Sequence, residues 1–88
     1  MTFSYDSDAD VLYVTFERSL HPAQYIENDN GDILRIDEQS GKIVGCTILF
    51  FLQRAKTGTI SVPEIGVVPF NQIANNLLNE RKQGKSQH

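Results

Sequence analysis

Apolar residues recur at every second position through the first half of the chain, in runs that stop at clusters of Asp, Asn, Ser and Gly. This alternation is typical of short antiparallel strands joined by turns. It predicts strands around residues 3–5 and over residues 11–17, 23–28 and 32–37. Asn30 and Gly31, between the last two strands, tolerate the positive φ angles of a tight hairpin.

The longest apolar run follows over residues 42–52, and neither of its alternating sets of side chains is polar enough to face water freely. The run therefore predicts a central strand that is covered on both faces. Gly45 within it indicates a bulge or a close backbone approach. Phe50 and Phe51 are neighbours near its end, so in a strand their rings would point to opposite faces. A further short strand is predicted over residues 59–62.

The period of the apolar positions changes after Pro69, which suits the first turn of a helix. A helix over residues 69–83 would gather its apolar residues on one face and stop at Gly84. The residues of that face are Phe70, Ile73, Ala74, Leu77 and Leu78. Residues 85–88 carry nothing apolar to anchor them, so we expect a disordered tail there.

These elements predict a mainly β, α+β fold, in which an antiparallel meander of five to six strands and one C-terminal helix form a single domain over residues 1–84. One helix covers at most one face of such a sheet. We therefore expect a homodimer or other homo-oligomer, formed through the face or edge that the helix leaves open. The alternative is that residues 54–68 fold back as the second layer, which is made possible by Ile60, Val62, Ile65, Val67 and Val68. The expected core comprises Leu12, Val14, Phe16, Ile36, Ile43, Val44, Ile48 and Leu49.

The net charge of −3 hides an uneven distribution. Residues 1–49 carry nine acids and three bases, a balance of −6, and residues 50–88 carry five bases and two acids, a balance of +3. An acidic body repels phosphate backbones, so nucleic-acid binding is disfavoured. Cys46 has no second cysteine, and no apolar run approaches the roughly 18–20 residues that cross a bilayer. We therefore expect a cytoplasmic protein without a membrane partner.

The run Tyr5-Asp6-Ser7-Asp8-Ala9-Asp10-Val11-Leu12-Tyr13-Val14 resembles the signature that opens a bacterial family called domain of unknown function 2283. That signature reads Tyr-Asp, two variable residues, Ala-Asp, one variable residue, Leu-Tyr and then Ile or Val, and every fixed position is met. Residues 37–49 resemble the family's second block, an Asp, a Gly turn and a Val-Gly strand. The family commonly has a glutamate where this chain has Thr47.

The resemblance implies a compact β-meander domain and no established activity. Some members lie beside small toxin-like proteins that cleave RNA, which implies an antitoxin-like or partner-binding role. Our leading hypothesis is therefore a protein-interaction or regulatory module. The alternative is a small-ligand or metal-binding domain that uses the turn around Asp6, Asp8 and Asp10.

The signature places tyrosines beside acids, and this gives the candidate ligand or interaction residues. These are Tyr5, Asp6, Asp10 and Tyr13, together with Phe50 and Phe51. Tyr5 and Tyr13 are expected to be cross-strand neighbours, either around a polar pocket or with hydroxyls that are satisfied locally.

The three aspartates of the turn imitate the ligand spacing of a calcium-binding loop. Val11 stands where that loop needs glycine, and a strand follows where the loop needs a helix. The structural alternative is a hairpin turn in which Asp6 and Asp10 accept backbone N–H bonds.

Nucleophilic catalysis has little support in the sequence. Cys46 lies in the most apolar run, where burial raises the pKa of a thiol, and His21 precedes a proline in a loop. The sequence contains no Gly-rich phosphate loop, Cys-x-x-Cys pair or His-Glu-x-x-His run. We therefore expect neither catalytic residues nor a cofactor.

Overall fold

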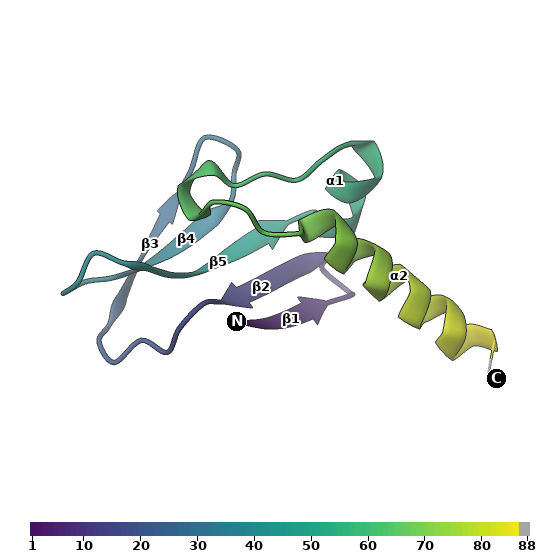
Figure 1. Cartoon of the computed structure of the whole chain (residues 1–88), viewed down its shortest axis with the longest axis horizontal. Helices are drawn as coiled ribbons and strands as arrows, with labels where there is room; N and C mark the ends of the chain where they lie inside the picture. Colours follow the sequence, from purple (N-terminus) through teal and green to yellow (C-terminus); the bar gives the residue numbers. More distant parts are fainter. Residues whose placement is uncertain (87–88) are drawn as a thin grey trace. The chain divides into compact units, whose positions relative to one another are not determined.

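The computed structural model describes the backbone of residues 1–86 and the side chains of residues 1–80. The chain divides into two compact units, Met1–Phe51 and Leu52–His88. The first is an antiparallel sheet, and the second contains the helical segments (Figure 1). The expectation of one domain over residues 1–84 stays a prediction.

The sheet has five strands, and every neighbouring pair is antiparallel. They are β1 (Thr2–Asp6), β2 (Val11–Thr15), β3 (Ala23–Glu27), β4 (Ile33–Asp37) and β5 (Ile43–Leu49). Their order is β1-β2-β5-β4-β3, so the long apolar strand β5 is central, as predicted, and β1 and β3 are the edges. The mainly β, antiparallel class is confirmed.

The predicted meander order is wrong, because β2 does not lie beside β3. After β2 the chain crosses to the opposite edge of the sheet, and β5 later returns between β2 and β4. Alternation along a strand defines its two faces but not its neighbours. Because of this crossover, the most apolar strand, β5, is hydrogen-bonded to β2 on one side and to β4 on the other.

The hairpin between β3 and β4 has a turn that the sequence favours. Between β3 and β4, Asn28 Oδ1 accepts bonds from the N–H groups of Asn30 and Asp32, at 3.0 and 2.9 Å. Gly31 follows with a φ of 86°, which glycine adopts without a steric cost. The predicted Asn-Gly hairpin is confirmed.

Gly45 marks both a close approach and an irregular register, as predicted. It pairs with Arg35 on β4, whereas Ile36 pairs with Ile43, so Val44 is an extra residue between the two pairs. The guanidinium of Arg35 lies over Gly45, where an added Cβ would collide with Nη2. A side chain at position 45 would therefore displace Arg35.

The apolar face of the sheet is formed by alternate residues of the inner strands. Leu12, Val14 and Ile48 are fully buried on this face. Val44 is also buried, whereas four other residues of the expected core are only half-buried. These four are Phe16, Ile36, Ile43 and Leu49.

The predicted strand ends three residues early, at Leu49. Phe50 has a φ of 54°, and α1 (Phe51–Thr57) begins directly after it. The prediction of a single C-terminal helix is therefore wrong. A short apolar run fits a helix and a strand equally well by periodicity, and this is why the run over residues 42–52 concealed the change.

The second unit continues with a 3-10 turn, η1 (Pro63–Ile65), and α2 (Phe70–Ser86). Residues 59–62 form no strand, contrary to expectation. Asn71 Nδ2 donates to the carbonyl of Gly58 at 2.9 Å, and its Oδ1 accepts from the N–H of Ile60 at 3.0 Å. One side chain thus connects the start of α2 to the segment after α1.

The predicted C-terminal helix is confirmed, with the expected amphipathic pattern. Phe70 and Ala74 are buried, and Asn75, Asn76 and Asn79 on its polar side are exposed. The helix continues past Gly84 to Ser86. The predicted disordered tail includes residues 87–88, which lie outside the described part of the chain. No helix within the described residues is long and apolar enough to cross a bilayer.

Candidate functional site

The signature residues form the turn between β1 and β2. The Tyr5 hydroxyl donates a hydrogen bond to Asp10 Oδ1 over 2.7 Å. Asp6 Oδ1 accepts bonds from the N–H groups of Asp8 and Ala9, at 3.0 and 3.3 Å. Asp10 has a φ of 56°, which Asp tolerates better than most residues. The predicted hairpin turn, in which a carboxylate accepts backbone N–H bonds, is confirmed for Asp6. The carboxylate of Asp10 accepts a hydrogen bond from the Tyr5 hydroxyl.

The predicted pairing of the two signature tyrosines is wrong. Tyr5 pairs with Leu12 and Tyr13 with Ser4, so the two rings lie on opposite faces of the sheet. The ring of Tyr5 instead lies beside that of Phe51, with the centroids 6.2 Å apart. Tyr13 is 42% exposed on the other face. No polar pocket between the two tyrosines is formed.

Phe50 and Phe51 differ in exposure as predicted, but not because they point to opposite faces of a strand. Phe51 is fully buried and Phe50 is 60% exposed. The positive φ of Phe50 turns the chain into α1, so the two residues separate at a turn rather than within a strand. The exposed Phe50 ring remains a candidate interaction residue.

The turn has no arrangement that suggests a metal site. Among the described residues, no group of three or more His, Cys, Asp or Glu side chains could hold a metal ion. Asp6 bonds the turn backbone, and Asp10 bonds the Tyr5 hydroxyl. Local structure thus accounts for both carboxylates.

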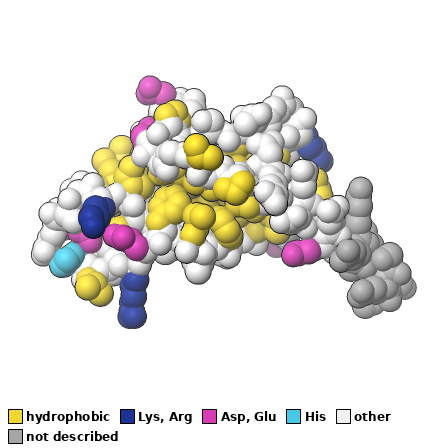
Figure 2. All heavy atoms as spheres, in the orientation of Figure 1, with side chains coloured by type: hydrophobic (Ala, Val, Ile, Leu, Met, Phe, Trp, Pro, Cys, Tyr) yellow, Lys and Arg dark blue, Asp and Glu magenta, His cyan; other side chains and the backbone are white. Residues whose placement is uncertain are grey.

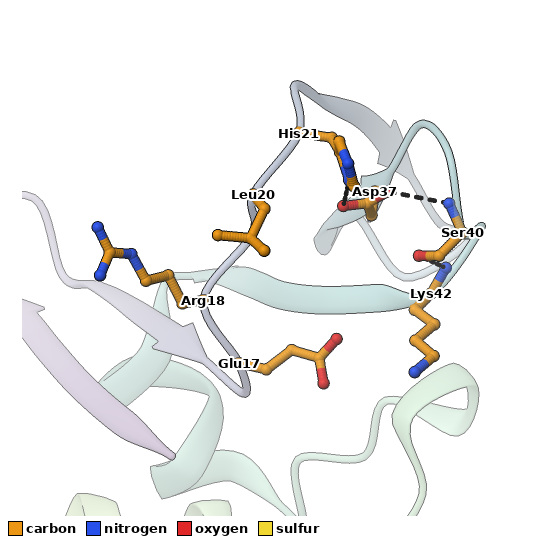
Figure 3. A pocket seen from close by; sticks show the side chains of 7 residues that line it. All are labelled: Glu17, Arg18, Leu20, His21, Asp37, Ser40 and Lys42. Atoms are coloured by element: carbon orange, nitrogen blue, oxygen red, sulfur yellow. Dashed lines mark hydrogen bonds and ion pairs between the residues drawn. The ribbon is translucent and has the colours of Figure 1, made fainter.

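A pocket of about 180 Å³, which the sequence did not predict, lies where the loop after β2 meets the turn after β4 (Figure 3). His21 points toward Asp37, and its Nδ1 lies 3.2 Å from Asp37 Oδ2. At the left of the surface view, acidic, basic and histidine side chains lie close together (Figure 2). The lining residues are Glu17, Arg18, Leu20, His21, Asp37, Ser40 and Lys42.

Asp37 organises this pocket. Its Oδ1 accepts bonds from the N–H groups of Gln39 and Ser40, both at 2.9 Å. The bond from Ser40 is the largest of the causes that hold the pKa of Asp37 well below its usual range. Burial opposes this shift, and the bonds from His21, Gln39 and Ser19 add to it. The ionised carboxylate is therefore the form that the turn requires.

Ser19, His21 and Asp37 are the residue types of a hydrolytic triad, but their bonds are arranged differently. Ser19 Oγ lies 2.7 Å from the His21 carbonyl oxygen and 3.2 Å from Asp37 Oδ2. Its proton is directed to these acceptors and not to the imidazole, which would have to accept it for nucleophilic attack. The cluster therefore fastens the loop to the turn. The sequence signal for the backbone bonds that Asp37 accepts was its position at the start of a turn that contains Ser40 and Gly41.

Cys46 is an unreactive thiol at the centre of the sheet. It is fully buried, and this burial, with the charge of Asp32, raises the pKa of Cys46 to about 11. Arg35 opposes the shift. A protonated thiol without solvent access does not act as a nucleophile.

The edge strand β3 is largely exposed, as is the other edge strand, β1. Four of its five residues are exposed, and the other, Ala23, is half-buried. Tyr25 is 70% exposed on one face, and Ile26 is 46% exposed on the other. Natural edge strands are often protected by Pro, Lys or a bulge, and β3 contains none of these.

The hydrogen bonds at the two ends of β3 show which backbone groups face outward. The N–H of Asn28 bonds the carbonyl of Asp32 at 2.9 Å, and the N–H of Glu38 bonds that of Pro22 at 3.1 Å. Hydrogen-bonded pairs alternate along an antiparallel ladder. The N–H and C=O groups that point away from β4 are therefore those of Ala23, Tyr25 and Glu27.

The comparison with known families adds one finding. The model of a family described as a protein of unknown function (DUF2283) matches residues 2–51. The chain belongs to the DUF2283 family. No curated protein and no solved structure matches the chain.

The DUF2283 match spans the whole sheet, from the start of β1 to the first residue of α1. Within it, the signature residues Tyr5, Asp6 and Asp10 form the β1–β2 turn. Thr47, where the resemblance placed a glutamate in other members, pairs with Tyr13 and Ile33 on the face that carries Arg35. An acid at this position would therefore share a face with that guanidinium.

Proposed function

We propose that this DUF2283 domain is a protein-interaction module, and that it binds an extended segment of a partner along the outer edge of β3. The observation that carries the proposal is the outward direction of the backbone groups of Ala23, Tyr25 and Glu27 on an exposed strand. Such an edge is a template for strand addition, in which main-chain bonds give affinity and alternate side chains give specificity.

The exposed side chains support the same edge. Tyr25 and Ile26 lie on opposite faces of β3, so an added strand would cover apolar surface on both sides of the sheet. The other edge, β1, exposes Phe3 about as much as β3 exposes Ile26, but its second aromatic residue, Tyr5, contacts Asp10 and Phe51 of the same chain.

An antitoxin-like role is the finer form of this proposal. The segment that binds β3 would then belong to a small toxin, as the family resemblance suggests. Neither Cys46 nor the cluster around Asp37 has the arrangement of a catalytic site, which favours binding over catalysis.

The test is photo-crosslinking in the cells that express the chain. A benzophenone amino acid replaces Tyr25 on β3 or, as the control, Phe3 on β1. We expect a discrete crosslinked product from position 25 only, and mass spectrometry identifies the attached peptide. The amides of Ala23, Tyr25 and Glu27 should exchange more slowly with solvent in the isolated complex than in the free domain.

A backbone variant separates strand addition from side-chain contact. Glu27→Pro removes an outward N–H without removing a bond to β4, and Glu27→Gln keeps that N–H. We expect the crosslink to be lost with proline and retained with glutamine. A crosslink that survives Glu27→Pro, or equal products from positions 3 and 25, would contradict the proposal.

A further inference from the structure

We infer that the partner strand at β3 is β3 of a second copy of this chain, paired antiparallel about a two-fold axis at Tyr25. This inference rests on the proposed function and names a second copy, in place of a small toxin, as the occupant of the β3 edge. It follows from the direction of the backbone groups, from the register they impose and from the charges that the register brings together.

The outward groups of β3 are arranged symmetrically. Ala23 and Glu27 lie two residues on either side of Tyr25, and all three direct N–H and C=O away from β4. When two copies meet antiparallel with Tyr25 opposite Tyr25, each Ala23 lies opposite the other copy's Glu27. Every outward group then has a partner, in hydrogen-bonded pairs whose Cα atoms are about 5.5 Å apart.

The charges favour this register. Glu27 is the only charged residue of β3, and the centred register places it opposite a small neutral alanine. A shift that places Glu27 opposite Glu27 would set like charges directly against each other, which destabilises a strand pair. The centred register also pairs the full length of both strands.

The side chains fit the same arrangement. The two Tyr25 rings become cross-strand neighbours on one face, an arrangement that stabilises antiparallel pairs. On the other face, Gln24 of each copy lies opposite Ile26 of the other, so Ile26 gains an apolar neighbour in the Gln24 stem. The two five-stranded sheets become one continuous sheet, and both exposed β3 edges are removed.

The opposition of residues 24 and 26 gives a test that is specific to the register. Gln24→Lys with Ile26→Lys places like charges opposite each other twice. Gln24→Glu with Ile26→Lys places opposite charges there instead. Phe3→Lys is the matched control, since Phe3 on the other edge is 44% exposed and Ile26 is 46% exposed.

Sedimentation velocity on the purified full chain, at about 10 and about 200 µM, covers the micromolar range of affinity. We expect a concentration-dependent dimer for the natural chain and for Phe3→Lys. The double-lysine variant should weaken the dimer at least about tenfold, and the Glu/Lys variant should restore it in a salt-sensitive form. Circular dichroism checks that each variant retains the sheet.

The outcomes separate this inference from the proposed function. A natural chain that is monomeric at the higher concentration, or a dimer that the double-lysine variant leaves unchanged, overturns pairing with a second copy. A monomer that still crosslinks another protein through position 25 leaves the proposed function standing. A monomer with no such crosslink overturns both.

Discussion

Arg35 lies across Gly45 on the neighbouring strand, and the space above this glycine is occupied by its guanidinium. Nη2 of Arg35 donates to Thr15 Oγ1 at 2.8 Å and to the Val14 carbonyl at 3.2 Å. Arg35 thereby connects β4 to β2 across β5. Three strands of the sheet depend on the absence of a side chain at position 45.

Gly45→Ala should destabilise the domain by about 1–3 kcal/mol, the usual cost of overpacking. The new Cβ would collide with Arg35 and would lie 2.5 Å from the Val14 carbonyl oxygen, which is backbone and cannot rotate away. Chemical denaturation measures the change. Gly58→Ala is the control, since no atom lies within 4 Å of the added Cβ there. Equal effects at the two positions would show that the sheet adapts to the methyl group.

Tyr5→Phe removes the hydrogen bond to Asp10 and leaves the ring beside Phe51. We expect a loss of about 0.5–1.5 kcal/mol in the free energy of unfolding, as for other single hydrogen bonds. Tyr13→Phe, on a residue that is 42% exposed, should change stability by less than about 0.5 kcal/mol. The signature would not have the structural role assigned to it if both variants were equally stable.

Ile48→Ala should cost about 2–5 kcal/mol, because Ile48 is fully buried on the central strand. Thermal and denaturant unfolding should agree on this loss. Val67→Ala, at a fully exposed side chain, provides the surface comparison. A loss below about 0.5 kcal/mol at position 48 would argue against a tightly packed sheet face.

Asp37 should make the domain sensitive to acid. Its folded pKa is depressed, chiefly by the Ser40 N–H bond, so its stabilisation is complete above the unfolded pKa of about 3.9 and is lost as the pH falls below it. The melting temperature of the natural chain should therefore fall between about pH 5 and pH 2. Asp37→Asn should flatten this dependence and lower stability at neutral pH, whereas Glu38→Gln should preserve it. An unchanged slope in Asp37→Asn would mean that other groups dominate.

Cys46 should resist thiol reagents in the folded protein. Its pKa of about 11 leaves the thiol protonated at about pH 8, and the side chain has no solvent access. Labelling with a disulfide reagent should be slow, should follow unfolding and should become rapid in concentrated guanidinium chloride. Rapid labelling of the native protein would indicate that the central strand opens locally.

The sequence by itself determined four of the five strands to within a few residues, the hairpin at Asn30 and Gly31, and the amphipathic face of α2. These features depend on residues that are close in the chain, because alternation, turn preference and helical period are local properties. The Asp6 turn could be predicted for the same reason. The end of β5 could not, because Phe50 and Phe51 continue an apolar run that suits either element.

The tertiary structure decided which strands are neighbours. Pairing between β2 and β5 joins residues that are 30 to 38 positions apart, and no local pattern encodes that register. No local pattern encodes the placement of Tyr5 and Tyr13 either, because a one-residue difference in register puts their rings on opposite faces of the sheet. The contacts of Asp37 with Ser19 and His21 likewise join a turn to a loop that is distant in the sequence. The outward groups of β3 also became visible only once its pairing with β4 was known. Side-chain type gives a residue its chemistry, but only the pairing of distant strands determines what that chemistry faces.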